Sequence, residues 1–331
     1  MFIFLLQLTA PQVPRSGLDL MPVQTENFGQ ALWQILCGAA KTLRPDLSEA
    51  ASISLSVVGL ILLISIIRLI PGSSSKTPEL IGAVGIGTIL LQSTNSLVSL
   101  GMHTIEELSS YGKLLLPVMT SAMAAQGGLT TSGAMYAGTA LFNSLLTSLL
   151  TKLLKPMVYV FLVLCTANAA LGEELLKKMA AFVKWSATWT LKTILYIFTG
   201  YMSITGVISG TTDAASLKAA KLTISGVVPV VGGILSDASD AVLVGAAVVK
   251  NAAGIYGILA FLAIFVSPFL KIGCHYLILR FTGAICAVFG VKRCTDLISD
   301  FSAAMNLLLA MTGSVCLLQL ISTVCFLRGV G

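Results

Sequence analysis

The sequence has 331 residues, of which 56% are hydrophobic and 10% charged, and its mean hydropathy is +0.94. A soluble domain carries about 25% charged residues, so this chain lacks the charge that a water-facing surface requires. The net charge of +6 comes from basic residues that stand singly or in pairs between apolar segments. That pattern is typical of membrane anchors and excludes a nucleic-acid-binding surface. Because apolar stretches near the ~20 residues of a spanning helix recur, we predict an all-α, polytopic transmembrane helical bundle.

Residues 1–50 form the first predicted region, a signal-like segment followed by an extracytoplasmic or interfacial amphipathic part. Met1–Ala10 is apolar but too short to span, and no Lys or Arg precedes it. It is interpreted as a weak secretory signal or as an interfacial anchor. Phe28–Leu43 has an amphipathic pattern with Trp33, which suits a helix lying on the membrane surface.

Residues 51–331 are predicted to form one transmembrane domain with about seven to eight crossings. The first clear span is Ile53–Ile70, and Arg68 and Lys76 mark the following connection as cytoplasmic. The later apolar stretches are Leu80–Gly101, Ala134–Leu154, Met157–Leu171, Ala187–Ser209, Ala241–Val249, Ala252–Leu270, Ile272–Gly290 and Ala303–Leu327.

A proline interrupts the short apolar stretch Leu114–Ala125 at Pro117, and a Gly/Thr-rich segment follows it. We therefore predict a broken or re-entrant helix over 114–133. Such backbone survives at membrane depth only where protein buries it or it lines a wet cavity.

A faint internal repeat appears when the chain is shifted by 112 positions. This shift aligns Pro117 with Pro229 and Pro156 with Pro268. The repeat halves would lie near 114–172 and 226–284. Interrupted apolar segments at matching positions are typical of transporter cores, and chance identity among small and apolar residues is the alternative.

Ionisable residues inside apolar sequence are the main candidates for function. Asp237 and Asp240 follow Gly232 and Gly233. At membrane depth such carboxylates are functional by default, whereas at the interface they cost little. Lys218 and Lys221 share a helix face, where interfacial snorkelling is favoured over pairing with headgroups or with those carboxylates.

Arg280 lies near the middle of its apolar segment, so it either pairs inside the bundle or its segment lies flat at the interface. Gly206 and Gly210 form a GxxxG motif that indicates helix packing. The full set of transport or gating candidates is Pro117, Asp213, Lys218, Lys221, Pro229, Gly232, Gly233, Ser236, Asp237, Asp240, Lys250, Asn251 and Arg280.

Sequence motifs of catalysis are missing from the chain. It contains no Walker A loop, HExxH or GxSxG motif. The seven cysteines form no CxxC pair, and His103 and His275 are the only histidines. We therefore expect no enzymatic activity, no metal site and no cofactor.

The segment Thr211–Gly257 resembles the stage III sporulation protein AE family. The matching positions are Asp213, Lys218, Lys221, Pro229–Gly233, Ser236–Asp237, Asp240, Lys250–Asn251 and Gly254. The order of apolar segments resembles that family along nearly the whole chain. The short N-terminal segment without basic residues departs from the family and leaves its cleavage undecided.

The resemblance implies a multi-pass protein of the mother-cell membrane that faces the engulfed forespore. It implies a part in the channel complex, or feeding tube, that joins the two cells and sustains late forespore gene expression. The implied partners are other stage III sporulation A proteins, including a cytoplasmic ATPase and ring-forming proteins, with stage II sporulation protein Q beyond them. Membrane lipid and copies of the chain itself complete the expected contacts.

Two rival functions stand beside this interpretation. One is a self-contained secondary transporter coupled to ions or protons through Asp237 and Asp240. The other is a scaffold that only docks the ATPase and the rings.

Overall fold

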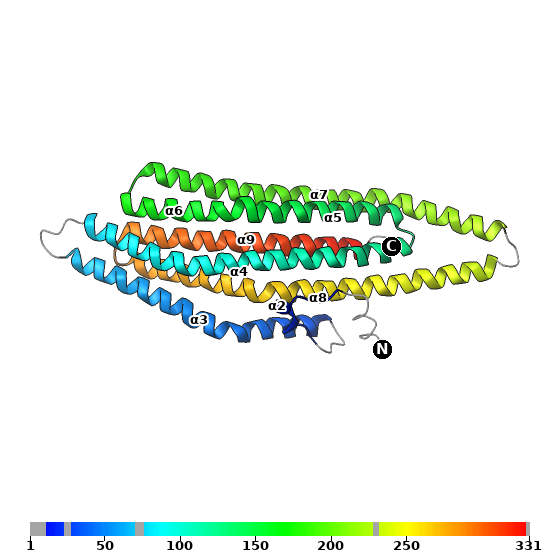
Figure 1. Cartoon of the computed structure of the whole chain (residues 1–331), viewed down its shortest axis with the longest axis horizontal. Coiled ribbons are helices and arrows are strands. Elements are labelled where there is room, and N and C mark those ends of the chain that lie inside the picture. Colours follow the sequence, from blue (N-terminus) through cyan, green and yellow to red (C-terminus); the bar gives the residue numbers. More distant parts are fainter. Residues whose placement is uncertain (1–10, 23–27, 70–75, 228–231, 329–331) are drawn as a thin grey trace.

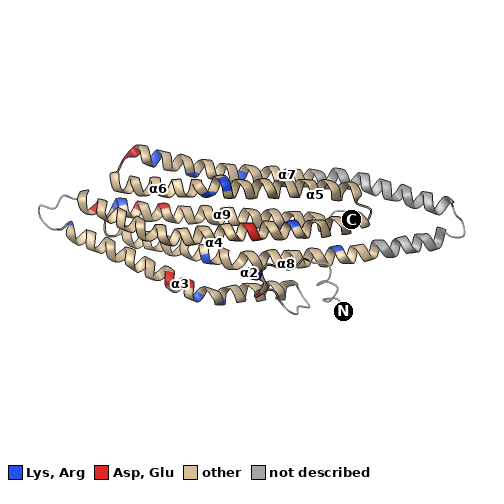
Figure 2. Cartoon of the chain, in the orientation of Figure 1, with Lys and Arg blue, Asp and Glu red and all other residues tan. Residues whose placement is uncertain are grey.

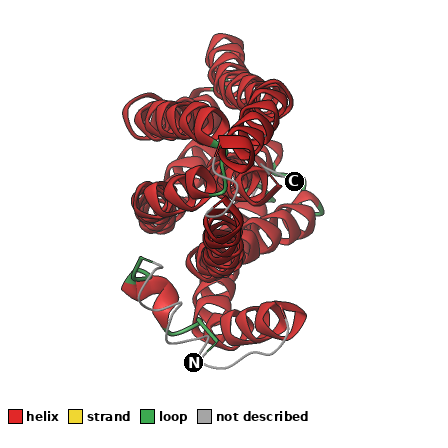
Figure 3. Ribbon diagram, turned by 90° about the vertical axis from the view of Figure 1, so that its right-hand side faces the viewer, coloured by secondary structure: helices red, strands yellow, loops and turns green. Residues whose placement is uncertain are grey.

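The computed structural model describes residues 11–22, 28–69, 76–227 and 232–328, with the backbone alone at 76 and over 205–243. This part of the chain consists of helices joined by short connections, and it contains no strand (Figure 3). The helices are α2 (Arg15–Leu18), α3 (Phe28–Ile67), α4 (Lys76–Ala125), α5 (Leu129–Leu149), the π-helix η1 (Leu150–Leu154), α6 (Lys155–Leu171), α7 (Glu174–Val227), α8 (Gly232–Ala287) and α9 (Lys292–Arg328).

The long helices run roughly antiparallel in one elongated bundle (Figure 1). Among the described residues, five stretches are long and apolar enough to cross a membrane, which confirms the predicted helical membrane fold. They are Phe28–Ile67, Thr77–Ala125, Leu129–Leu171, Val244–Ala287 and Lys292–Arg328. At 56 residues, α8 is about 84 Å long, so the bundle exceeds the ~30 Å of a hydrocarbon core.

Helix α9 is the packing centre of the bundle, because it contacts α4, α5, α6, α7 and α8. Its core side chains, among them Phe301, Leu308 and Met311, are fully buried. Helix α3 lies at the periphery (Figure 1), where its first turns bury Ala31 and Ile35 in a small cluster with α8. The predicted surface segment Phe28–Leu43 is therefore the start of a longer packed helix, with Trp33 on its exposed side at 68% exposure.

The structure corrects several predicted breaks. Pro117 lies inside α4, and the chain reverses instead after Ala125, where Gly127 takes the positive φ of 91°. Pro268 lies inside α8, so the predicted spans Ala252–Leu270 and Ile272–Gly290 belong to one helix. A proline removes one backbone hydrogen bond, and neighbouring helices in a packed membrane bundle make that loss tolerable.

The predicted spans on either side of Pro156 also form one continuous rod. Helix α5 passes through η1 into α6, with Pro156 in the first turn of α6. A π-turn widens the helix locally, which accommodates a residue without an N–H. The predicted repeat halves stay a prediction. The turn before α5 does not recur at the matching positions of the second half, because the residues 112 positions later lie inside α8.

Small residues bring the helices close together. In the middle of α5, Gly138 is buried beneath Tyr201 of α7, whose hydroxyl donates to the carbonyl oxygen of Ala134 at 3.0 Å. Polar pairs cross the same region. Asn143 donates to the carbonyl oxygen of Ser109 at 3.2 Å, and Thr139 and Ser322 share a hydrogen bond of 2.8 Å.

An ionic cluster ties one end of the bundle together. The Glu79 carboxylate, 12% exposed, forms an ion pair with Arg68 and lies 3.4 Å from Nε of Arg293. Arg68 also donates to the carbonyl oxygen of Gly290 at 3.3 Å. One carboxylate thus joins the end of α3, the start of α4 and the start of α9; we call these three charged side chains the Glu79 cluster.

Replacing Gly138 by Ala should destabilise the protein, because the added Cβ would overlap the Tyr201 ring. Overpacking of this kind costs about 1–3 kcal/mol. Gly133→Ala on the same helix is the matched control, since nothing lies within 4 Å of its Cβ position, and helix propensity should raise its stability by up to about 1 kcal/mol. Thermal unfolding in detergent measures both, and equal midpoints for the two variants would contradict this packing.

Glu79→Gln should lower the free energy of unfolding, because it leaves two guanidinium groups close together without their carboxylate. Loss of one partner from a buried pair costs about 3–5 kcal/mol, and partial exposure reduces this to roughly 2 kcal/mol. Glu174→Gln removes the same charge from an exposed pair with Lys178 and should change stability by less than about 0.5 kcal/mol. A Glu79 variant as stable as the Glu174 variant would show that the cluster contributes nothing.

Candidate functional site

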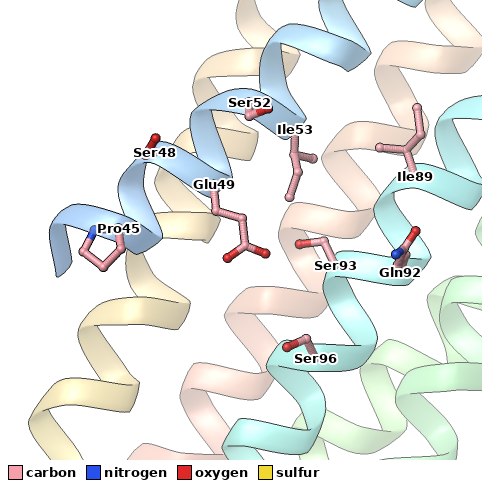
Figure 4. Close-up of a pocket in the computed structure, with 9 residues that line it drawn as sticks. All are labelled: Pro45, Ser48, Glu49, Ser52, Ile53, Ile89, Gln92, Ser93 and Ser96. Carbon is pink, nitrogen blue, oxygen red and sulfur yellow. The ribbon is translucent and has the colours of Figure 1, made fainter. Parts of the chain in front are cut away.

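A polar groove between α3 and α4 is the most distinctive site in the described part of the chain (Figure 4). It has a volume of about 660 Å³. Each helix contributes one face, with lining residues at the i, i+3, i+4, i+7 spacing that places side chains on the same side of a helix. The lining residues are Pro45, Ser48, Glu49, Ser52 and Ile53 of α3, and Ile89, Gln92, Ser93 and Ser96 of α4.

The groove forms where α3 separates from α4. Farther along the two helices, Gly82 and Gly85 of α4 accept Ile64 and Leu60 of α3 in close contact. Toward its N-terminus, α3 contains Pro45 and turns to pack on α8 instead (Figure 1). Proline inside a helix is a common cause of such a bend, and the serines beyond it are too short to fill the gap.

A smaller cavity of about 10 Å³ lies beside the groove, and Ile53 and Ser93 line both. Its walls come from α3, α4, α8 and α9 and include the hydroxyl of Thr94 and the imidazole of His275, which is 5% exposed. The ring Nδ1 of His275 lies 3.1 Å from the carbonyl oxygen of Lys271. Because a carbonyl only accepts, Nδ1 carries the proton of this hydrogen bond.

Polar contacts between α3 and α8 continue this region. Asp46 pairs with Lys271 at 2.5 Å, and Ser54 and Thr282 share a hydrogen bond of 2.5 Å. Lys271, His275 and Thr282 follow one face of α8 at helical spacing. Asp46 and Lys271 lie outside the lining of the groove, and among the described residues that line it Glu49 is the one charged side chain.

The chemistry of the groove is that of a hydrogen-bond acceptor. A carboxylate only accepts, while hydroxyl and amide groups accept as well as donate. Groups of three or more His, Cys, Asp or Glu side chains able to hold a metal are absent from the described residues. The groove therefore suits a ligand that brings donors and positive charge.

The sequence-predicted residues lie elsewhere. Pro117 is inside α4, Lys250 is buried in α8 at 4% exposure, and Asn251 beside it is exposed. Arg280 is exposed on α8, with its guanidinium carbon 6.0 Å from the ring centroid of Tyr276 one turn earlier. Its segment belongs to the long helix α8, and the role of Arg280 stays a prediction.

The other candidates lie outside the residues whose side chains are described. All but Pro229, which lies outside the described residues, belong to the end of α7 or the start of α8, and these two segments lie at the same end of the bundle (Figure 1). Their roles stay predictions. These residues are Gly206, Gly210, Asp213, Lys218, Lys221, Pro229, Gly232, Gly233, Ser236, Asp237 and Asp240.

Sequence reasoning missed the groove, because its residues come from two helices. Ser48 and Ser52, with Glu49 between them, share a helix face, as do Gln92, Ser93 and Ser96. The sequence feature that could have indicated the groove is a stripe of polar residues on each of two successive helices. Which stripes face each other depends on the packing.

Comparison with known proteins gives the chain a family. The family model for Stage III sporulation protein AE matches residues 23–328. A Bacillus subtilis (strain 168) protein described as Stage III sporulation protein AE is 26% identical over 215 residues. That alignment covers 64% of this chain and 54% of the relative, so the chain spans about half the length of the relative. No solved structure matches the chain. Because the family model covers nearly its whole length, the chain belongs to the stage III sporulation protein AE family.

Proposed function

We propose that the chain is a non-enzymatic membrane component of the channel complex that links the mother cell and the forespore. It would lie in the mother-cell membrane around the forespore and support late forespore gene expression and spore formation. The family match over residues 23–328 carries this proposal. The bundle of apolar helices supports it, since such helices suit a protein that forms part of a membrane conduit.

The distribution of basic residues orients the bundle in the membrane. The end that holds the Glu79 cluster carries Lys or Arg in, or within five residues of, each of its connections: Arg68 and Lys76, Lys177 and Lys178, and Lys292 and Arg293. At the opposite end, neither Gln126–Gly128 nor 228–231 contains a basic residue, Lys218 and Lys221 lie farther back in α7, and Arg328 ends α9. Cytoplasmic connections carry an excess of Lys and Arg, so we place the Glu79 cluster in the mother-cell cytoplasm. Figure 2 shows how few charges interrupt the helices between the ends.

This orientation assigns the proposed partners to the two ends. A cytoplasmic ATPase among the stage III sporulation A proteins would meet the end with the Glu79 cluster. Ring-forming proteins of the intermembrane space would meet the other end, where α7 joins α8 and α9 ends. Contact with stage II sporulation protein Q would be indirect, through those rings.

A self-contained ion- or proton-coupled transporter is the second candidate function. The polar groove favours it, because it places a carboxylate between two helices that are long and apolar enough to span a membrane. A scaffold that docks the ATPase and the rings is the third, and flux through the purified protein alone would exclude it.

Single cysteines should label from opposite sides of the membrane. Leu129→Cys, at the start of α5, should react with an impermeant maleimide on intact protoplasts of vegetative cells that express the chain, because there its extracytoplasmic end faces the medium. Glu173→Cys, before α7, should react only after permeabilisation. Both positions are exposed, so accessibility is matched, and the parent protein gives the background of its own cysteines. Labelling of Glu173→Cys on intact cells would reverse the proposed orientation.

Cells without the chain should complete engulfment but fail to express a late forespore reporter. Wild-type protein should restore the reporter, whereas the double variant Asp237→Asn and Asp240→Asn should restore less than about a tenth of it if both carboxylates act in the conduit. The control is the double variant Glu106→Gln and Glu174→Gln, which removes the same charge from two exposed positions. Normal heat-resistant spore counts in cells without the chain would overturn the proposed function.

A further inference from the structure

We propose that the groove between α3 and α4 binds a small organic cation through its ammonium group, with the Glu49 carboxylate as counter-charge. The ligand is either a free amine or the headgroup of an ethanolamine lipid, which present the same ammonium chemistry. This proposal concerns binding alone and does not depend on the channel role.

The charge of the lining selects a cation. Glu49 contributes a full negative charge, and the described side chains that line the groove include no Lys, Arg or His. Nearby Lys271 already pairs with Asp46 at 2.5 Å. A bound ammonium group would therefore meet a carboxylate together with hydroxyl and amide oxygens, each of which accepts one of its N–H donors.

The surroundings of the groove favour a polar occupant, because Glu49 is exposed on a helix that also exposes apolar side chains. On the same helix, Leu47 and Leu55 are 42% and 74% exposed, as lipid-facing residues are. A carboxylate that faces hydrocarbon without a partner is costly. The gap between two helices removes that cost when it holds water or a ligand that supplies donors.

Size and donor set distinguish an organic cation from a metal ion. A volume of about 660 Å³ lies within the range of ~300–1,000 Å³ of small-molecule sites. A calcium ion needs six to eight oxygen ligands, several of them carboxylates, whereas Glu49 is the one carboxylate here. Pro45, Ile53 and Ile89 add an apolar wall that suits the carbon atoms of an amine.

Ethanolamine and ethylene glycol test the proposal, since they differ by an ammonium in place of a hydroxyl. The full chain is placed in nanodiscs of phosphatidylcholine and phosphatidylglycerol, and thermal unfolding is followed at constant chloride concentration. We expect ethanolamine to raise the midpoint saturably and ethylene glycol to leave it unchanged. Glu49→Gln should weaken the apparent affinity for ethanolamine at least about tenfold, as loss of one charged hydrogen bond does.

Glu106→Gln is the matched control, because it removes the same charge from an exposed position on α4 outside the groove. If Glu49→Gln unfolds by itself, Gln92→Leu replaces it, and a loss of affinity of about two- to tenfold is expected, because that change removes a neutral acceptor. Nanodiscs that contain phosphatidylethanolamine identify the source of the ammonium group. If the site binds this lipid, the unfolding midpoint of wild type should be higher in them than in the other nanodiscs, and added ethanolamine should raise it less. The midpoint of Glu49→Gln should not respond to the lipid. An ethanolamine response that persists in Glu49→Gln, or is matched by ethylene glycol, or is absent in both kinds of nanodisc, overturns the proposal.

Discussion

Backbone N–H and C=O groups find no water inside hydrocarbon, and the fold of this chain depends on that constraint. An unpaired group there costs several kcal/mol, so a helix continues through residues that would end it in water. Pro117 and Pro268 lie within helices for this reason, and η1 carries the chain from α5 into the turn that contains Pro156. The chain reverses where a glycine can take a positive φ, as at Gly127. The result is a small number of very long helices.

Long helices place distant residues side by side, and the two polar regions of the bundle follow from this. At one end, the Glu79 cluster joins α3, α4 and α9, and it lies at the connections that carry basic residues. Along the side, the bend of α3 near Pro45 leaves a gap that Ile89 and three polar side chains, Gln92, Ser93 and Ser96, line on α4. The first region would hold the bundle in one geometry and face a cytoplasmic partner. The second offers a ligand a negatively charged site beside the lipid.

Much of the fold was predictable, and the errors share one physical cause. Hydrophobic length identified the helical membrane fold, and the Thr211–Gly257 pattern indicated the family that the comparison confirms. The count of seven to eight spans is not confirmed. Lys271 and Pro268 were interpreted as an interruption, whereas Lys271 reaches Asp46 on α3 and the helix continues. A charge inside an apolar stretch ends a helix only if it has no partner, and the partner lies more than two hundred residues away.

The sequence by itself determined membrane residence, helical class and family, because these depend on composition, on apolar length and on a local pattern of residues. The tertiary structure alone decided where the chain turns, which charges pair, and that Glu49 faces Ser93 and Ser96 across a groove. The reason is the geometry of the bundle. Side chains point to all sides of a helix, so the sequence of α3 does not show which of its faces will be open. The first part of α3 packs on α8 rather than on α4, and this packing leaves the face with Glu49 open as a groove.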